Sequence, residues 1–210
     1  DKIVLTDADT RLATTEKIED AEEYLDENDL GALAFKVVPD GSASNIVDSF
    51  WNQLQALDYA MGRAMSGYTT GEKLRVDAED KNVRCIAGAG GMYDAEVLKK
   101  ALDHHSGNHA GDDIETTAIT QLVLNENVDY FSEVEFKTDV PKQYSELKDQ
   151  RIRWSKGSIQ AFSEHPKEYL KEAATFSRYG QTVAYEAGIS AIAPAFMAKT
   201  AFEASQEEIT

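Results

Sequence analysis

The spacing of apolar residues changes several times along the chain, and each change marks an expected element. Runs of β-branched and other apolar residues predict four strands, at 3–6, 31–38, 83–86 and 128–137. Apolar residues three and four positions apart predict helices at 15–28, 44–66, 94–102, 112–124, 141–162 and from 166 onward. Polar segments at 68–81 and 104–111 are expected loops. Strands and helices alternate and the last third is more helical, which is typical of an α/β fold.

We expect the strand at 3–6 to be buried, and two carboxylates directly follow it. Asp7 and Asp9 are one residue apart, and open α/β sheets place their ligands at the carboxyl ends of strands. Carboxylate oxygens are hard ligands of the kind that Mg²⁺ or Mn²⁺ combines with a substrate diphosphate. A solvated loop or a helix cap is the alternative explanation of the same pair.

A second acidic pair, Asp112 and Asp113, opens an expected helix. The partial positive charge at a helix N-terminus favours ionised carboxylates, and an ionised carboxylate can act as a general base toward a hydroxyl group. Simple N-capping explains the pair as well. The preceding His104, His105 and His109 are compatible with a zinc site, or more plainly with a polar loop.

Composition limits the partners of such sites. The 210 residues, 42% of them hydrophobic, allow one large domain or a domain with an appendage. The 38 acidic residues exceed the 21 basic ones and leave a formal charge of −17, which excludes a surface built to hold nucleic acid. The single cysteine, Cys85, excludes a disulfide framework, and we expect it to be a small core residue. The sequence contains no run of about 18 apolar residues, the length that predicts a membrane-spanning helix.

One window reverses the sign of the charge. Residues 142–156 contain five basic and two acidic residues, a net charge of +3. Arg151 and Arg153 are suited to gripping phosphate oxygens, and Trp154 offers a flat face to a sugar ring. The alternative is a helix with a few surface arginines and a core tryptophan.

In their order along the chain, four motifs resemble the D…DxD…(E/D)D…QxxRW series of inverting family 2 glycosyltransferases. They are Asp7-Ala8-Asp9, Gly88-Ala89-Gly90-Gly91-Met92-Tyr93, Gly111-Asp112-Asp113 and Gln150-Arg151-Ile152-Arg153-Trp154. The most similar branch is that of the processive, membrane-bound synthases of cellulose, chitin, hyaluronan and poly-N-acetylglucosamine. The resemblance covers about residues 1–160 and implies a GT-A-like nucleotide-diphospho-sugar transferase fold.

The resemblance also implies how the chain is divided. The family's first strand, nucleotide-base pocket and first aspartate precede its DxD motif, and this sequence contains none of them. We therefore expect the fold to be incomplete at the N-terminus, with residues 1–163 as the C-terminal portion of the catalytic domain. Residues 164–210 are then a helical segment, in which 179–202 match the family's amphipathic helices at the membrane interface. Ordinary helices that pack on the domain or fray at its end are the alternative explanation of 179–202.

Roles for individual residues follow from the resemblance alone. Asp7 and Asp9 match the pair that holds the nucleotide-sugar diphosphate, with Asp9 as the direct metal ligand. Asp113 matches the general base, and Asp112, where the family usually has Glu, matches its acidic neighbour on the acceptor side. Asp94 stands where the family often has Arg.

The two remaining motifs are expected to bind substrate. The resemblance places Gln150 and Trp154 by the acceptor sugar, and the small residues Gly88, Ala89 and Gly90 along the acceptor site. Arg151 and Arg153 are expected to bind the diphosphate.

The activity implied is an inverting transfer of a hexose or N-acetylhexosamine from a nucleotide diphosphate sugar, expected to be a UDP-sugar, to a glycan acceptor. Mg²⁺ or Mn²⁺ would assist it at the cytoplasmic face of the cell membrane. A nonprocessive transferase acting on a lipid or a small glycan is one alternative. A noncatalytic nucleotide- or glycan-binding module of degenerate transferase fold is the other.

Overall fold

A five-stranded mixed sheet organises the chain. The computed structural model describes residues 1–40, 50–57, 59–60, 83–107, 111–175, 180–181, 183–184 and 188. The strands are β1 (Lys2–Leu5), β2 (Thr10–Leu12), β3 (Ala32–Pro39), β4 (Gly91–Asp94) and β5 (Val128–Thr138). Their order in the sheet is β1-β4-β3-β5-β2. The neighbours β3 and β5 pair in parallel, and the other three neighbouring pairs are antiparallel. The α/β class predicted from the sequence is confirmed.

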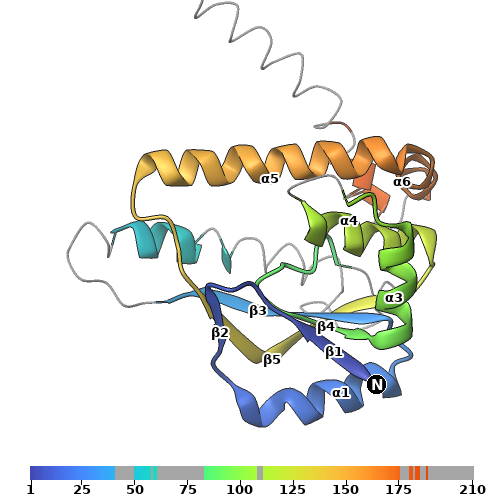
Figure 1. Cartoon of the computed structure of the whole chain (residues 1–210), viewed down its shortest axis with the longest axis horizontal. Coiled ribbons are helices and arrows are strands. Elements are labelled where there is room, and N and C mark those ends of the chain that lie inside the picture. Colours follow the sequence, from blue (N-terminus) through green and yellow to red (C-terminus); the bar gives the residue numbers. More distant parts are fainter. Residues whose placement is uncertain are drawn as a thin grey trace, which may run out of the picture.

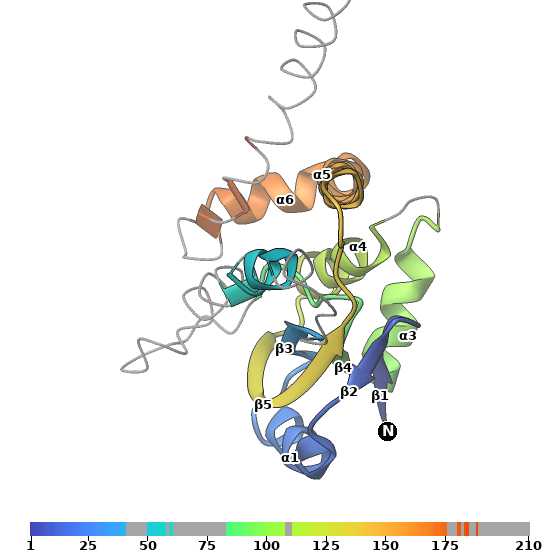
Figure 2. The same cartoon turned by 90° about the vertical axis from the view of Figure 1, so that its left-hand side faces the viewer.

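Helices lie on both faces of the sheet. They are η1 (Thr15–Lys17), α1 (Ile18–Glu27), α3 (Ala95–His104), α4 (Asp112–Ala118) with its π-helical continuation η3 (Ile119–Val123), α5 (Tyr144–Glu164) and α6 (Pro166–Ala173). Residues 50–57 and 59–60 are also helical. Helix α1 covers one face, while α4 and, beyond it, α5 lie on the other (Figure 1). Figure 2 shows α5 as the layer farthest from α1.

Side chains of β3 alternate between two cores, as the pleat of a strand requires. Leu33 and Phe35 belong to a core that α1 closes with Ala21 and Leu25. Ala32 and Ala34 belong to a second core on the side of α3. The predicted strands at 31–38 and 128–137 are therefore confirmed, and so is the amphipathic helix at 15–28.

The helix starts were predicted with mixed success. Asp94 caps α3 as expected, because its carboxylate accepts the backbone N–H groups of Glu96 (3.0 Å) and Val97 (3.2 Å). Pro166 opens α6, as expected for proline in a first helical turn. Helix α5 begins at Tyr144, three residues after the predicted start, since the Glu146 carboxylate accepts the Lys142 N–H (2.9 Å).

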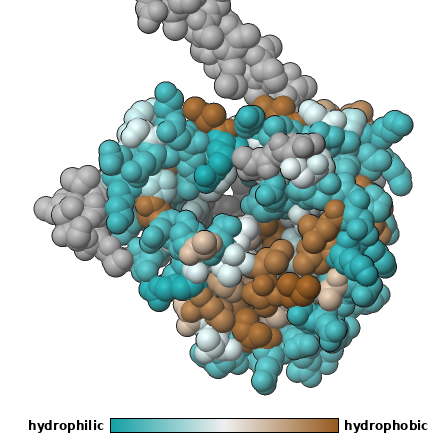
Figure 3. Space-filling view, in the orientation of Figure 1, coloured by the Kyte–Doolittle hydropathy of each residue, from teal (hydrophilic) through white to brown (hydrophobic). Residues whose placement is uncertain are grey.

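The strand predicted at 3–6 is confirmed as β1, but its predicted burial and the strand predicted at 83–86 were wrong. The first strand is not buried: Ile3, Val4 and Leu5 are each 40% exposed, because β1 lies at the sheet edge and pairs only with β4. Figure 3 shows apolar side chains gathered over this part of the surface. Residues 83–86 do not form a strand, although Val83 and Ile86 are buried.

Side chains replace the missing strand partners of residues 83–86. The Ile86 N–H donates to Thr117 Oγ1 (2.9 Å), and Gln121 Nε2 donates to the Val83 carbonyl (2.8 Å). Buried backbone groups need partners, and here α4 and η3 supply them in place of a neighbouring strand. The strand of this region is β4, which follows directly.

Several predictions fall outside the described residues: the loop at 68–81, the ends of the helix at 44–66, His109, and most of 179–202. No helix within the described parts of the chain has the length and apolar content needed to cross a membrane. The division at residue 163 stays a prediction.

Candidate functional site

Asp7 lies against Gly88, although 81 residues separate them in the sequence. Thr6, the residue after β1, donates a hydrogen bond from Oγ1 to the Ala89 carbonyl (3.3 Å) in the glycine loop that precedes β4. A Cβ atom added to Gly88 would lie 3.0 Å from one carboxylate oxygen of Asp7 and 3.3 Å from the other. Gly88 therefore allows the carboxylate an approach that a larger residue would crowd.

Asp113 contacts the same glycine from helix α4. It is the second residue of α4, and its Oδ2 accepts the Gly88 N–H at 3.2 Å while its Oδ1 accepts the Ile114 N–H at 2.8 Å. The first turn of α4 thus directs this carboxylate toward the end of β1. The structure brings together two acidic motifs that the sequence separates by about a hundred residues.

The pKa of Asp7 depends on its burial and on the charges of three other residues. Partial burial raises the pKa of Asp7 above its usual value, and the negative charges of Asp9 and Asp113 raise it further. Arg153, on α5, acts in the opposite direction. Three carboxylates and one arginine therefore share one electrostatic environment, in which negative charge is in excess and a cation would be stabilised.

Three other residues of the basic window, Arg151, Trp154 and Gln150, have surroundings of their own. Arg151 donates from Nη2 to Gln55 Oε1 (3.2 Å), and its guanidinium carbon lies 4.4 Å from the ring centre of Trp154. Trp154 is 41% exposed, so the alternative that made it a core tryptophan is wrong. Gln150 Oε1 is buried and has no hydrogen-bond partner among the described residues, as expected of a group that awaits a ligand or water.

A cavity of about 420 Å³ adjoins the base candidate. Asp112 and Asp113 line it on the side of α4, and Leu5, Ile86 and Leu102 supply aliphatic walls. The space is wide enough for a sugar ring, and a mixture of carboxylate and aliphatic surface suits the two faces of such a ring.

The sequence analysis missed two residues of this cavity, Tyr93 and His105. Burial raises the pKa of the Tyr93 phenol, and the charges of Cys85 and Asp113 raise it further. A hydrogen bond with Thr117 lowers this pKa, but by less. Tyr93 therefore stays protonated. Tyr93 belongs to the glycine motif and His105 to the histidine cluster, so both residues occur in motifs that the sequence shows. The sequence did not reveal that they line this cavity.

The residues of the glycine loop have different surroundings, and the expected role of residues 88–90 at an acceptor site stays a prediction. The loop contributes Ala87 and Gly91 to the cavity lining, not the residues 88–90 between them. A Cβ atom added to Gly90 would lie 2.7 Å from Cδ2 of the buried Phe136 ring, so this glycine is required by core packing. Ala89 is also buried, and Gly88 faces Asp7.

A zinc site finds no support in the described parts of the chain. No group of three or more His, Cys, Asp or Glu side chains there is arranged to hold a metal ion. His104 is exposed, and its Nδ1 lies 2.9 Å from the Lys100 carbonyl. Cys85 is half-buried.

Comparison with known proteins identifies the class of fold. No protein-family model and no curated protein sequence matches the chain. Among solved structures, it is similar to the mannosyltransferase PcManGT from Pyrobaculum calidifontis in complex with GDP-Man and Mn²⁺, at 15% sequence identity and a TM-score of 0.56. The match covers 99% of this chain and 55% of that one. The chain has a glycosyltransferase fold and spans about half the length of that structure.

Proposed function

We propose that the chain is the acceptor- and metal-binding portion of an inverting glycosyltransferase with a GT-A fold. It would transfer a hexose or N-acetylhexosamine from a nucleotide diphosphate sugar to a glycan. The observation that carries the proposal is the approach of Asp7 and Asp113 to Gly88, where the charges of Asp9 and Arg153 also act on Asp7. These are the carboxylates and the arginine that the four motifs singled out.

Asp113 is the proposed general base. Two backbone N–H groups orient its carboxylate, and the carboxylate borders the cavity in which an acceptor would lie. It accepts the proton of the acceptor hydroxyl while that oxygen bonds to the anomeric carbon of the donor. The bond between the anomeric carbon and the diphosphate breaks, and the nucleoside diphosphate leaves with the electron pair. One base and no covalent nucleophile imply a single displacement, hence inversion.

The carboxylates near Gly88 fit a divalent cation. Asp7 and Asp9 would hold Mn²⁺ or Mg²⁺, because their oxygens are hard ligands in a region with excess negative charge. Neither ion requires a complete protein cage when substrate phosphates supply the other ligands, which agrees with the absence of a three-residue metal cluster from the described residues. The ion, when bound, would neutralise charge on the departing diphosphate.

Arg153 is the described cation that acts on Asp7 from α5, and we propose that it binds the diphosphate. Arg151 stacks on Trp154 and would support the tryptophan as a platform for the acceptor sugar. The nucleotide base is left to experiment, because the solved neighbour holds GDP-Man and the resembling synthases suggest UDP-sugars. A location at the cytoplasmic membrane face is likewise proposed from the resemblance.

Replacement of the base tests the function. Asp113→Asn keeps the size and an oxygen acceptor for Gly88, so we expect nucleotide and Mn²⁺ binding to persist while transfer falls by about 10²–10⁴-fold. Glu23→Gln on α1, an exposed carboxylate on the other face of the sheet, is the control. Transfer from UDP- and GDP-sugars and nucleotide affinity are measured for all three proteins. Near-wild-type transfer by Asp113→Asn would disprove the assignment of Asp113 as the general base. Nucleotide binding without transfer in every protein would favour the alternative of a noncatalytic binding module.

A further inference from the structure

A buried carboxylate, Glu115, lies two residues after the proposed base. The two side chains point in different directions, since residues two apart are separated by about 200° around a helix. Asp113 faces Gly88, whereas Glu115 is 0% exposed and faces residues 105–107. Burying an ionised carboxylate is costly unless its oxygens are well supplied with donors. The groups around the Glu115 carboxylate therefore indicate how its burial is compensated.

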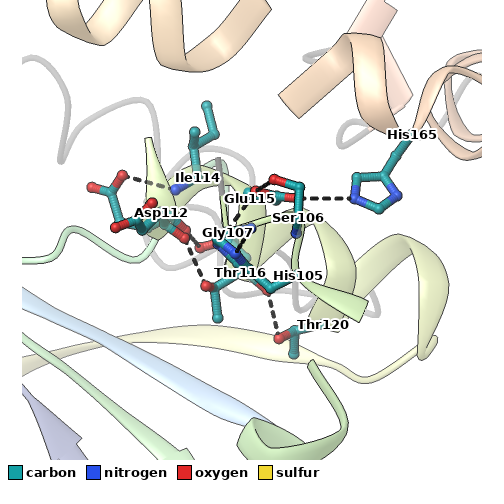
Figure 4. Close-up of polar contacts among 11 residues, drawn as sticks. His105, Ser106, Gly107, Asp112, Ile114, Glu115, Thr116, Thr120 and His165 are labelled. Carbon is teal, nitrogen blue, oxygen red and sulfur yellow. Dashed lines mark hydrogen bonds and ion pairs between the residues drawn. The ribbon is translucent and has the colours of Figure 1, made fainter. Parts of the chain in front are cut away.

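Two segments besides α4 converge on this carboxylate (Figure 4). Ser106 donates twice, from its backbone N–H to Oε1 and from its hydroxyl to Oε2, both at 2.9 Å. The Nε2 atoms of two histidines also approach it: His105 lies 3.3 Å from Oε2, and His165, at the α5–α6 junction, lies 3.5 Å from Oε1. One side chain thus joins three segments of the fold.

The histidine contacts depend mainly on the negative charge of Glu115. Both are longer than the serine bonds, and neither Nε2 atom has a partner with hydrogen-bond geometry among the described residues. The Gly107 N–H donates to Nδ1 of His105 (3.0 Å), which makes that atom an acceptor and leaves the ring proton on Nε2, the nitrogen nearer to the carboxylate. A negative charge on Oε2 would attract this N–H group without a well-aligned hydrogen bond.

The oriented segment is a wall of the proposed acceptor cavity. His105 and Gly107 line the cavity together with Leu5 and Ile86, and Asp112 and Asp113 line it from α4. The distance between this wall and the base consequently depends on the bonds that tie Ser106 and His105 to Glu115.

We propose that Glu115 is a positioning residue for the acceptor: its charge holds residues 105–107 against α4 and so sets the acceptor's place relative to Asp113. The proposal rests on the transferase function above and deepens it. Glu115 itself does not touch the reacting atoms. A purely structural role would instead give a protein of lower stability with unchanged kinetic constants per folded molecule.

The test compares Glu115→Gln with Glu115→Asp and with the control Glu23→Gln. The Gln variant keeps the size but removes the charge and turns an amide toward the histidine N–H groups. We expect its kcat to fall by about tenfold to a hundredfold, the effect of misplacing a reactant by about an ångström, and its acceptor KM to rise. Nucleotide affinity should stay that of the wild type. The Asp variant retains the charge and should recover part of the lost kcat.

The outcomes separate this inference from the function on which it rests. If wild type and Glu23→Gln show no transfer from any donor, the proposed function fails, and the positioning role with it. If they are active and folded Glu115→Gln has their kcat and acceptor KM, the function stands and the positioning role is overturned. Should Glu115→Gln not fold, Ser106→Ala, which removes one donor to Oε2, should lower kcat about threefold to tenfold. Unchanged constants for that variant would also overturn the role.

Discussion

A single methyl group at Gly111 should separate the two helices that carry the proposed base and the proposed diphosphate ligand. Gly111 precedes α4 and packs directly on α5. A Cβ atom added there would lie 2.6 Å from the Cα atom and 3.2 Å from the carbonyl carbon of Gly157. Both neighbours are backbone atoms, so no side-chain rotation relieves the contact. The φ angle of Gly111 is −132°, which alanine adopts freely, so packing alone resists the substitution.

The size of the effect follows from that contact. An ordinary contact of 3.4–4 Å requires the two backbones to move apart by about 1 Å. Overpacking of this kind costs about 1–3 kcal/mol, and at this chain length each kcal/mol lowers the melting temperature by about 2–4 °C. Arg153 lies one turn before Gly157 and hence on the same face of α5. The same movement should withdraw it from Asp7 and lower transfer by up to about a hundredfold.

Thermal unfolding and transfer kinetics of Gly111→Ala measure the two effects. Gly188→Ala is the matched control, because a Cβ atom added to Gly188 meets no described atom within 4 Å. We expect the control to melt at or slightly above the wild-type temperature and to retain full activity. A Gly111→Ala protein as stable and active as the control would refute the close packing of α4 on α5 and the reasoning built on it.

Three further predictions concern the cap, the metal and the core. Asp94→Ala should lower the free energy of unfolding by about 0.5–2 kcal/mol at pH 7. Partial burial raises the pKa of Asp94, but bonds from Lys2 and two backbone N–H groups outweigh it and hold the pKa below its usual 3.8. The stabilisation is therefore complete above about pH 4 and should disappear as the pH falls through the lowered pKa. Urea unfolding of the wild type and of Asp94→Ala from pH 7 to 2.5 measures this loss. A stability difference that does not change with pH would show that the ionised carboxylate does not cause it. Asp9→Asn should weaken Mn²⁺ binding in the presence of a nucleoside diphosphate by at least about tenfold in calorimetric titration, and unaltered affinity would remove Asp9 from the metal site. Gly90→Ala should cost about 1–3 kcal/mol because its Cβ atom would meet the Phe136 ring; in urea unfolding Phe136→Leu should restore part of this loss, and no loss at all would contradict the packing.

Local patterns were sufficient for elements that their own residues mark clearly. The helical spacing of Ala21 and Leu25 predicted α1, and the carboxylate of Asp94 predicted the start of α3. The apolar run of β3 and the longer run of β5 predicted the two central strands, which are held by parallel pairing with each other. In each case the residues that mark the element lie within about ten positions of one another, although the strand that pairs with β3 is about a hundred residues away.

The features that were predicted incorrectly are those that distant partners decide and that no local pattern reveals. Residues 83–86 have the composition of a strand, but Thr117 and Gln121 satisfy their backbone groups, and no local pattern reveals those partners. The run at 3–6 is apolar whether its strand is central or at an edge, and only the sheet order made it an exposed edge. Trp154 is exposed for the same kind of reason, since neighbouring elements determine which face of α5 is covered.

The candidate site divides in the same way. The sequence by itself determined which residue types are present: the acidic pairs, the glycine loop, the basic window and their order along the chain. Only the tertiary structure brought Asp7 and Asp113 to Gly88, formed the cavity beside them, and buried Glu115 between Ser106 and the histidines. Carboxylates act on a substrate through distances of a few ångströms. Those distances depend on the packing of β1, α4 and α5, which spacing along the chain does not encode.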